Sequence, residues 1–318
     1  MKAVFLDQDT FSTQVSLKRI AKQVTALKCY QQTQASQVVE RSLDAEVLIT
    51  NKVVLDNKIL AQLPKLKLIC ISATGINNID LLAAQQHHIA VTNVSGYAKQ
   101  SVAQYVFAQL LNYFSQPNHH IANVTHGQWQ QSTSFCLHGN GSSELAGKTI
   151  GIIGYGSLGQ AVAQIAHAFG MKVMISERPN AAMVRTNRKS FNQVIREADI
   201  LTLHCPQTPA TENLIDAQVL SEMKSSAVLI NTARGALVNE QDLLTALKQN
   251  DIAYAILDVL SEEPPKANHL LLQNQPKNLA ITGHIAWASI EAQQRLLDLV
   301  GDNIAAFKQG QTTNRVDL

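Results

Sequence analysis

Three glycines, Gly154, Gly156 and Gly159, stand between a hydrophobic run that predicts a strand over 149–153 and a helical pattern over 160–169. At such a junction the first glycine allows a tight turn, the second lets a ligand approach the backbone, and the third lets the helix pack closely on the strand. A second predicted strand, 172–175, leads to the acidic Glu177, 18 residues beyond Gly159. This spacing is typical of a sheet that binds a dinucleotide, with the pyrophosphate at the helix N-terminus and a ribose at the acid.

The acid and its neighbour leave the choice of nicotinamide cofactor open. Glu177 would repel a 2′-phosphate and therefore favours NAD, whereas Arg178 could neutralise such a phosphate. Pro179 limits the freedom of the chain directly after this pair. We expect NAD, and NADP remains open.

The alternation of strands and helices predicts two α/β domains, which fits a length of 318 residues. Strands separated by segments of helical length form parallel sheets. In the first hundred residues we expect strands at 3–6, 24–27, 45–49, 66–71 and 89–92. A second series is expected at 149–153, 172–175, 200–203, 227–230, 253–257 and 279–281.

Composition excludes several classes of protein. The 26 Lys and Arg against 24 Asp and Glu give a net charge of +2, which does not suggest a nucleic-acid surface. No apolar run approaches the roughly 18 residues of a membrane-spanning helix. The first residues read as a strand rather than a signal peptide, and the four cysteines are scattered, so we expect a cytoplasmic protein with reduced thiols.

Between the two series lies a helix with apolar residues at helical spacing and Ser101 as its expected N-cap. The stretch 116–143 that follows is expected to be irregular and to cover a partner subunit. Its histidines, His119, His120 and His126, have a spacing that suits no common metal site, and we expect no metal. A final helix is expected from Ser289.

Three further segments each follow a strand of the second series and carry Arg234, Glu263 and His284. Ligands of such sheets bind outside the carboxyl ends of the strands, so all three residues are candidates for chemistry. The guanidinium can bind a substrate carboxylate with two hydrogen bonds, the imidazolium can give a proton to a carbonyl oxygen, and the carboxylate can orient that imidazolium.

Together these motifs resemble the D-isomer-specific 2-hydroxyacid dehydrogenase family over nearly the whole chain. Within it the segments 73–80 and 284–289 are most similar to glycerate dehydrogenases, also called hydroxypyruvate reductases. The resemblance implies that Arg234 binds the substrate carboxylate and carbonyl, that His284 is the general acid and base, and that Glu263 raises the basicity of His284. It also implies further contacts. Those with substrate are Thr74 and Gly75, with 94–96 in a cleft between the domains, and those with cofactor are Ser157, Leu158, Cys205, Pro206, Thr211, Thr232, Ala233 and Asp258. Arg178, beside Glu177, and His284 are further candidates for the cofactor, and the bulky Trp287, shortly after His284, is a candidate for contact with a small polar substrate.

The family implies a discontinuous, flavodoxin-like substrate domain of residues 1–98 and 287–318, a Rossmann domain of 99–286 that binds NAD, and a homodimer whose arm is 116–143. Three positions depart from the usual pattern: Gly283 replaces a proline, Gln104 a glutamate and Glu177 an aspartate. None removes Arg234, Glu263 or His284.

The expected activity is reversible hydride transfer between a nicotinamide and a short 2-oxo acid. Hydroxypyruvate or glyoxylate would be reduced to D-glycerate or glycolate. A D-lactate-type or branched 2-oxo acid reductase, or a protein that senses NAD and binds a partner, are the alternatives.

Overall fold

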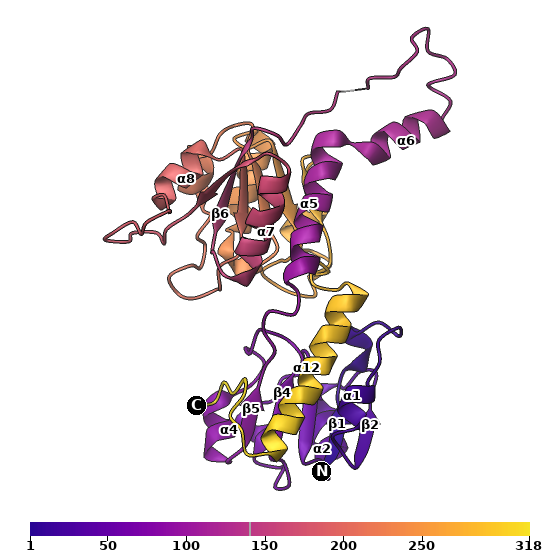
Figure 1. Cartoon of the computed structure of the whole chain (residues 1–318), viewed down its shortest axis with the longest axis vertical. Coiled ribbons are helices and arrows are strands. Elements are labelled where there is room, and N and C mark those ends of the chain that lie inside the picture. Colours follow the sequence, from indigo (N-terminus) through magenta and orange to yellow (C-terminus); the bar gives the residue numbers. More distant parts are fainter. Residues whose placement is uncertain (140) are drawn as a thin grey trace. The chain divides into compact units, whose positions relative to one another are not determined.

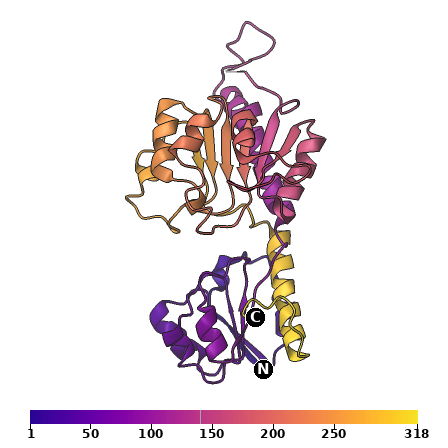
Figure 2. The ribbon, with the colours of Figure 1, turned by 90° about the vertical axis from the view of Figure 1, so that its left-hand side faces the viewer.

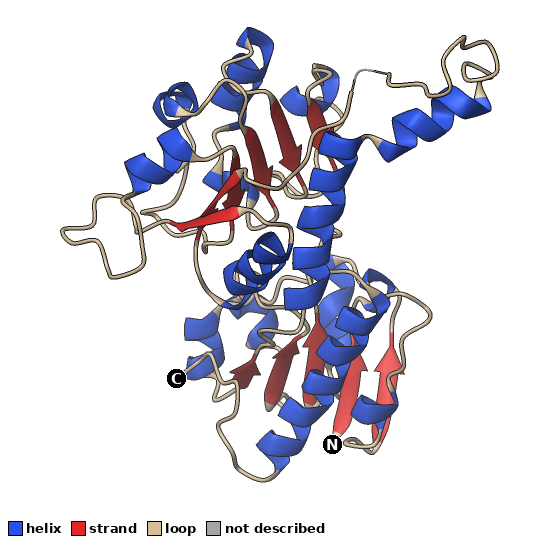
Figure 3. Cartoon of the chain, turned by 45° about the horizontal axis from the view of Figure 1, so that its top comes forward, coloured by secondary structure: helices blue, strands red, loops and turns tan. Residues whose placement is uncertain are grey.

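The computed structural model describes residues 1–139 and 141–318, which form two compact units (Figure 1). One unit comprises Met1–Ala98 with Trp287–Leu318, and the other comprises Lys99–Ala286. Each contains one parallel sheet with helices against it (Figures 2 and 3), which confirms the predicted fold class. No helix among the described residues is both long and apolar enough to cross a membrane.

The first unit has a five-stranded sheet in the order β2-β1-β3-β4-β5, the order of flavodoxin-like folds. Its strands begin and end within two residues of the predicted ones. They are β1 (Lys2–Phe5), β2 (Ala26–Cys29), β3 (Val47–Thr50), β4 (Leu68–Ile71) and β5 (Ala90–Thr92).

Helices cover both faces of this sheet. Because side chains alternate along a strand, Leu48 and Ile69 face one core while Ile49 and Leu68 face the other. The helices are α1 (Lys18–Ala21), α2 (Val38–Ser42), α3 (Asn57–Leu60), α4 (Leu81–Gln86) and α12 (Ile290–Lys308), with short 3-10 turns at Gln8–Thr10 and Ala35–Gln37. Helix α12 packs on α1 and β4, and Ser289 accepts a hydrogen bond from the Ala292 N–H, which confirms the predicted capped start.

The second unit has six strands in the order β11-β10-β9-β8-β6-β7. The chain runs from β6 outward to β7 and then crosses back to β8 on the other side of β6. The carboxyl ends of β6 and β8 therefore flank the switch point where ligands of such sheets bind. The strands are β6 (Thr149–Ile153), β7 (Lys172–Ile175), β8 (Ile200–Leu203), β9 (Val228–Asn231), β10 (Tyr254–Leu257) and β11 (Leu279–Ile281).

Two helical layers enclose this second sheet. Ile150 and Ile152 join the core beneath α5 and α7, and Ile153 joins the core on the opposite face. The helices are α5 (Lys99–Ser115), α6 (Pro117–Thr125), α7 (Ser157–Ala168), α8 (Phe191–Glu197), α9 (Ala217–Glu222), α10 (Glu240–Gln249) and α11 (Leu270–Gln273), with a 3-10 turn at Gly235–Leu237.

Two local predictions were wrong. Helix α5 begins at Lys99, so Ser101 is inside the helix, where its hydroxyl donates to the Ala286 carbonyl (2.7 Å) instead of capping the start. The stretch 116–143 is not irregular throughout, because α6 occupies its first part. Gln116 has a left-handed backbone that separates α6 from α5, and Pro117 stands at the first helical position, where its missing N–H costs nothing.

Candidate active site

The three predicted catalytic residues follow neighbouring strands. β9, β10 and β11 are adjacent and parallel, so their carboxyl ends lie at one edge of the sheet. Arg234 follows β9, Glu263 lies in the loop after β10, and His284 follows β11. The structure brings two of them into contact, with His284 Nδ1 2.7 Å from Glu263 Oε2.

The backbone presents the His284 ring in one orientation. His284 has a left-handed conformation (φ 56°), and its N–H donates to the Asp258 carbonyl at 2.7 Å. With Nδ1 bound to the Glu263 carboxylate, the proton sits on Nδ1 and Nε2 is the nitrogen available to a substrate. The imidazole is about a quarter exposed, at 26%.

Asp258 holds the His284 loop from within. The side chain is completely buried, and its carboxylate accepts hydrogen bonds from Thr282 Oγ1 (2.6 Å), the Ile285 N–H (2.9 Å) and the Ala286 N–H (2.8 Å). The described contacts show that Asp258 positions this loop. The cofactor contact of Asp258 that the family resemblance implies stays a prediction.

A hydrogen-bond chain from α5 extends this anchor. Gln109 Nε2 donates to the Tyr105 hydroxyl at 3.1 Å, and that hydroxyl lies 2.5 Å from Thr282 Oγ1. Since Thr282 donates to Asp258, Tyr105 must donate to Thr282. Burial raises the pKa of the Tyr105 phenol, which keeps the donor proton in place.

The Glu263 loop has its own buried anchor. Glu263 Oε1 accepts from the Leu260 N–H at 3.0 Å. Next to Leu260, Ser261 donates its N–H (2.7 Å) and its hydroxyl (2.8 Å) to the carboxylate of Glu240, the first residue of α10. Glu240 is also 3.1 Å from His269 Nε2, and both side chains are less than a tenth exposed. Sequence reasoning missed this pair, because an acid in a first helical turn is ordinary.

Arg234 stands on a turn that the Asn231 side chain ties together. Asn231 accepts from the Ala233 N–H (3.0 Å) and donates to the Arg234 carbonyl (2.8 Å). A Cβ on the next residue, Gly235, would overlap the carbonyl group of Leu260. The Arg234 turn and the Glu263 loop therefore touch backbone to backbone, which only glycine permits.

The glycine-rich turn has room for a pyrophosphate. Gly154 has a left-handed backbone (φ 94°), and a Cβ there would lie 2.5 Å from the Cys205 nitrogen. A Cβ on Gly159 would overlap the Gly154 carbonyl, whereas one on Gly156 would meet nothing within 4 Å. Helix α7 starts at Ser157, followed by the half-buried Leu158, and Gly156 at its N-cap has no side chain to cover the first N–H groups. These residues fit a dinucleotide.

Other predicted cofactor residues surround the ends of β8 and β9. Thr232 Oγ1 is buried and has no hydrogen-bond partner among the described residues, which fits a hydroxyl that binds a ligand. Ala233 is nearly buried, and burial raises the pKa of the Cys205 thiol to about 11, so this thiol stays protonated. The Thr211 hydroxyl turns inward and donates to the carbonyl of Pro206 at 2.8 Å.

Glu177, the expected partner of the ribose, is engaged within the chain. Its carboxylate is 4% exposed and pairs with the Arg185 guanidinium at 2.5 and 2.7 Å. It also accepts from the N–H groups of Arg178 (2.9 Å) and Arg185 (3.3 Å). The Arg185 hydrogen bonds, with help from the Arg178 N–H, hold the pKa of Glu177 far below its usual range.

The remaining predicted residues belong to the other unit. Thr74 and Gly75 follow β4, and Thr74 Oγ1 donates to the Val94 carbonyl at 2.9 Å. Trp287 packs edge-on against Phe11 and Tyr97, with ring centroids 5.8 and 6.2 Å apart.

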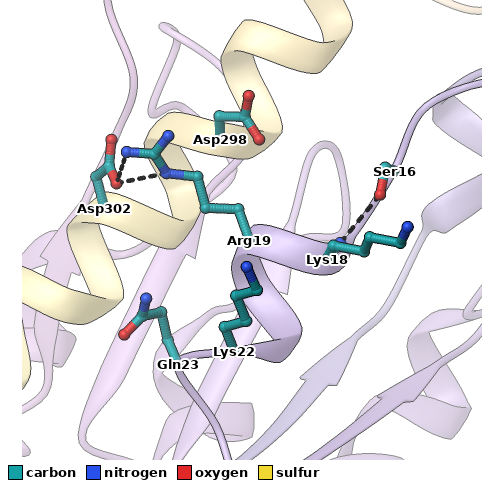
Figure 4. Close-up of a pocket in the computed structure, with 7 residues that line it drawn as sticks. All are labelled: Ser16, Lys18, Arg19, Lys22, Gln23, Asp298 and Asp302. Carbon is teal, nitrogen blue, oxygen red and sulfur yellow. Dashed lines mark hydrogen bonds and ion pairs between the residues drawn. The ribbon is translucent and has the colours of Figure 1, made fainter.

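Neither a metal centre nor a second site emerges from the rest of the described chain. Among residues 1–139 and 141–318, no three His, Cys, Asp or Glu side chains are grouped as metal ligands would be. A pocket of about 430 Å³ lies beside α1 and α12 of the first unit (Figure 4). Arg19, on its wall, pairs with Asp302, and none of the predicted site residues lines it.

With this geometry in place, comparison with known proteins identifies the family. The sequence model described as "D-isomer specific 2-hydroxyacid dehydrogenase, NAD binding domain" matches residues 107–286. The chain belongs to the D-isomer-specific 2-hydroxyacid dehydrogenases. It is thus an NAD(P)-dependent oxidoreductase that interconverts 2-oxo and 2-hydroxy acids, as predicted.

Full-length relatives carry related names. A putative 2-hydroxyacid dehydrogenase of Haemophilus influenzae is 42% identical, covering 97% of this chain and 98% of the relative. A glycerate dehydrogenase of Methylorubrum extorquens is 39% identical, covering 99% of each chain. A hydroxypyruvate reductase of Blautia hydrogenotrophica is 35% identical, covering 90% and 89%.

Solved structures agree on the fold and on the class of cofactor. The NAD complex of the D-isomer-specific 2-hydroxyacid dehydrogenase from Lactobacillus delbrueckii superposes with a TM-score of 0.77 at 26% identity, covering 99% of this chain and 100% of the other. An acyclic imino acid reductase in complex with NADPH and D-Arg gives 0.82 at 27%, with the same coverage.

Two glycines provide a matched test of the backbone contact beside Arg234. We expect Gly235→Ala to lower the free energy of unfolding by about 1–3 kcal/mol, because its Cβ must displace Leu260. Since Leu260 holds Glu263, turnover should fall as well. Gly283→Ala, where a Cβ meets nothing within 4 Å and no left-handed φ is needed, should leave stability unchanged or raise it by about 0.4–1 kcal/mol. Urea unfolding and initial rates measure both, and equal effects of the two changes would contradict the contact.

The Glu177–Arg185 pair predicts a dependence of stability on pH. A carboxyl whose pKa is lower in the folded than in the unfolded state stabilises the fold above the unfolded value, about 4.3, and loses this contribution as the pH falls below it. Glu177→Gln should therefore be less stable than wild type at pH 7, and the difference should shrink below about pH 4. Glu197→Gln, on exposed surface, is the control. A difference that does not change with pH would argue against the pair.

Proposed function

We propose that this enzyme reduces hydroxypyruvate and glyoxylate to D-glycerate and glycolate, and runs the reverse oxidations. The observation that carries the proposal is the 2.7 Å contact between His284 Nδ1 and Glu263, on the same sheet edge as Arg234. The names of the relatives, glycerate dehydrogenase and hydroxypyruvate reductase, support these substrates.

The residues divide the chemistry between them. In the reduction, a nicotinamide coenzyme held at the glycine-rich turn of Gly154, Gly156 and Gly159 would supply the hydride that C2 of the 2-oxo acid receives. His284 Nε2 gives a proton to the carbonyl oxygen, which becomes the hydroxyl of the product. The Glu263 carboxylate holds Nδ1 of the ring and so keeps Nε2 oriented toward the substrate. In the oxidation, neutral His284 takes the hydroxyl proton back.

Arg234 is the proposed anchor of the substrate. Its guanidinium has five N–H donors, of which one at Nη1 is used by the Ala233 carbonyl at 2.6 Å, so a planar fork remains for a carboxylate. Backbone N–H groups at Thr74 and Gly75 are proposed to add to the same carboxylate, with Trp287 and residues 94–96 bounding the space. In this proposal residues 1–98 and 287–318 are the substrate domain, and 99–286 the domain that binds NAD.

The proposed roles predict different kinetic defects. We expect His284→Ala to lower kcat by about 10²–10⁴-fold, because general acid catalysis is lost. Arg234→Lys should raise KM for the 2-oxo acid and also lower kcat, because lysine cannot form the two-pronged contact. Glu263→Gln should lower kcat with a smaller effect on KM, because the His284 ring loses the carboxylate that orients it. Steady-state rates with hydroxypyruvate, glyoxylate, pyruvate and a branched 2-oxo acid measure all three.

Near-normal turnover of His284→Ala would contradict the assignment. Preference for pyruvate or the branched acid would move the proposal to a D-lactate-type or branched-acid reductase. NADH binding without turnover of any acid would favour a sensing protein.

We further propose that the enzyme works as a homodimer in the cytoplasm. Helix α6 and the segment after it project from the rest of their unit (Figure 1) and expose Ile121 (63%), Trp129 (51%) and Phe135 (90%). Exposed apolar side chains grouped on one segment suit a second copy of the chain. The four cysteines are free thiols, which suits a reducing compartment.

If this arm forms the dimer interface, substitutions in it should lower the mass of the protein in solution. Light scattering after gel filtration should give twice the chain mass for wild type and a lower mass for the double variant Ile121→Ser with Phe135→Ser, since the variant removes apolar area from the interface. Leu82→Ser, equally exposed but on α4, is the control. A monomeric wild type, or a variant that keeps the dimer mass, would rule out this role of the arm.

A further inference from the structure

We propose that the segment 177–189, directly after β7, binds the 2′-phosphate of NADP(H) through Arg178 and Arg185. The enzyme then binds NADPH at least as tightly as NADH. The inference rests on the proposed function of the dinucleotide site and adds which coenzyme that site accepts.

The position of the segment follows from the topology. β7 pairs with β6, the strand that leads into the Gly154 turn. When a pyrophosphate lies at the start of the helix after the first strand, the adenosine ribose lies at the carboxyl end of the second. In this chain that end is Ser176 and Glu177.

The charge of the segment is opposite to that of a phosphate. Residues 177–189 contain one acid, Glu177, and four basic residues, Arg178, Arg185, Arg188 and Lys189, a net charge of +3. The whole chain carries +2. The segment is therefore locally basic where a 2′-phosphate would lie, which favours a dianion there.

The acid that usually selects NAD is already occupied. An acid at this position accepts hydrogen bonds from the ribose hydroxyls and repels a phosphate. Here each Glu177 oxygen accepts two hydrogen bonds from the chain itself: Oε1 from the Arg178 N–H and Arg185 Nη2, and Oε2 from the Arg185 N–H and Nε. With its charge paired and its side chain 4% exposed, Glu177 has little left with which to bind a ribose or repel a phosphate.

Two guanidinium groups remain accessible beside it. Arg178 is exposed, and its backbone is fixed by the N–H bond to Glu177. Arg185 uses only Nε and Nη2 on Glu177 and is 56% exposed, so further N–H donors can reach a phosphate. Arg188 has a structural part, because its Nη1 donates to the Ser176 carbonyl at 3.0 Å. This hydrogen bond and the isolated β-bridge between Ser176 and Lys189 join the end of the segment to the end of β7.

Calorimetric titration of the purified enzyme with NADPH and with NADH tests the inference without turnover. Wild type should bind NADPH with a Kd equal to or below that for NADH. Arg178→Ala should raise the Kd for NADPH roughly tenfold or more and leave NADH unchanged, since a hydrogen bond between charged groups is lost. Arg185→Ala should raise it further and strengthen NADH binding, because it also frees Glu177. The double variant Glu177→Gln with Arg185→Ala should recover part of the NADPH affinity.

Arg196→Ala is the matched control, since Arg196 pairs with Glu222 on a different part of the unit and should change neither Kd. A wild-type preference for NADH of tenfold or more would overturn the inference. The same holds if neither Arg178→Ala nor Arg185→Ala changes the Kd for NADPH. In either case NADH binding and reduction of hydroxypyruvate leave the proposed function standing. If neither coenzyme binds, the proposed function fails as well.

Discussion

The proposed catalytic edge of the second unit depends on the buried carboxylate of Asp258. It accepts hydrogen bonds from one side chain and two backbone N–H groups of the segment 282–286, while its own carbonyl receives the N–H of His284. Burial of a carboxylate without such donors would cost free energy, so the loop stabilises the buried Asp258 and Asp258 in turn fixes the loop. The left-handed backbone of His284, unfavourable for a residue with a Cβ, persists because these bonds fix both sides of it.

Backbone contacts also join the two segments that carry Arg234 and Glu263, the other proposed catalytic residues. Gly235 allows the Arg234 turn to touch Leu260, and the Leu260 N–H in turn holds Glu263. Glu240 then fixes Ser261 from the start of α10. The consequence is that Arg234 and Glu263 cannot shift independently. Preorganisation of this kind reduces the movement that the protein must make when charge develops on a substrate.

The sequence predicted the parts of this fold that local patterns determine. Both sheets, the glycine turn and the residues at the strand ends could be read from hydrophobic runs and from glycines at fixed spacing, because parallel strands place their carboxyl ends at one edge. The predicted start of α5 is three residues too late, since the Ser101 hydroxyl binds a partner 185 positions along the chain instead of capping the helix. The roles of Tyr105, Glu240 and His269 could not be predicted from local sequence patterns, because these residues act through contacts with residues far along the chain.

Glu177 lies where the glycine motif predicts an acid, but its hydrogen bonds differ from those that the motif predicts. Spacing from the glycines places an acid at the end of the second strand, and that placement is what the structure has. Its chemistry depends on a residue eight positions later, because Arg185 turns back and neutralises the carboxylate. An acid that selects a coenzyme must be free to accept ribose hydroxyls and to repel phosphate. A paired and buried acid does neither effectively, so the choice of coenzyme passes from the motif residue to the basic segment that surrounds it.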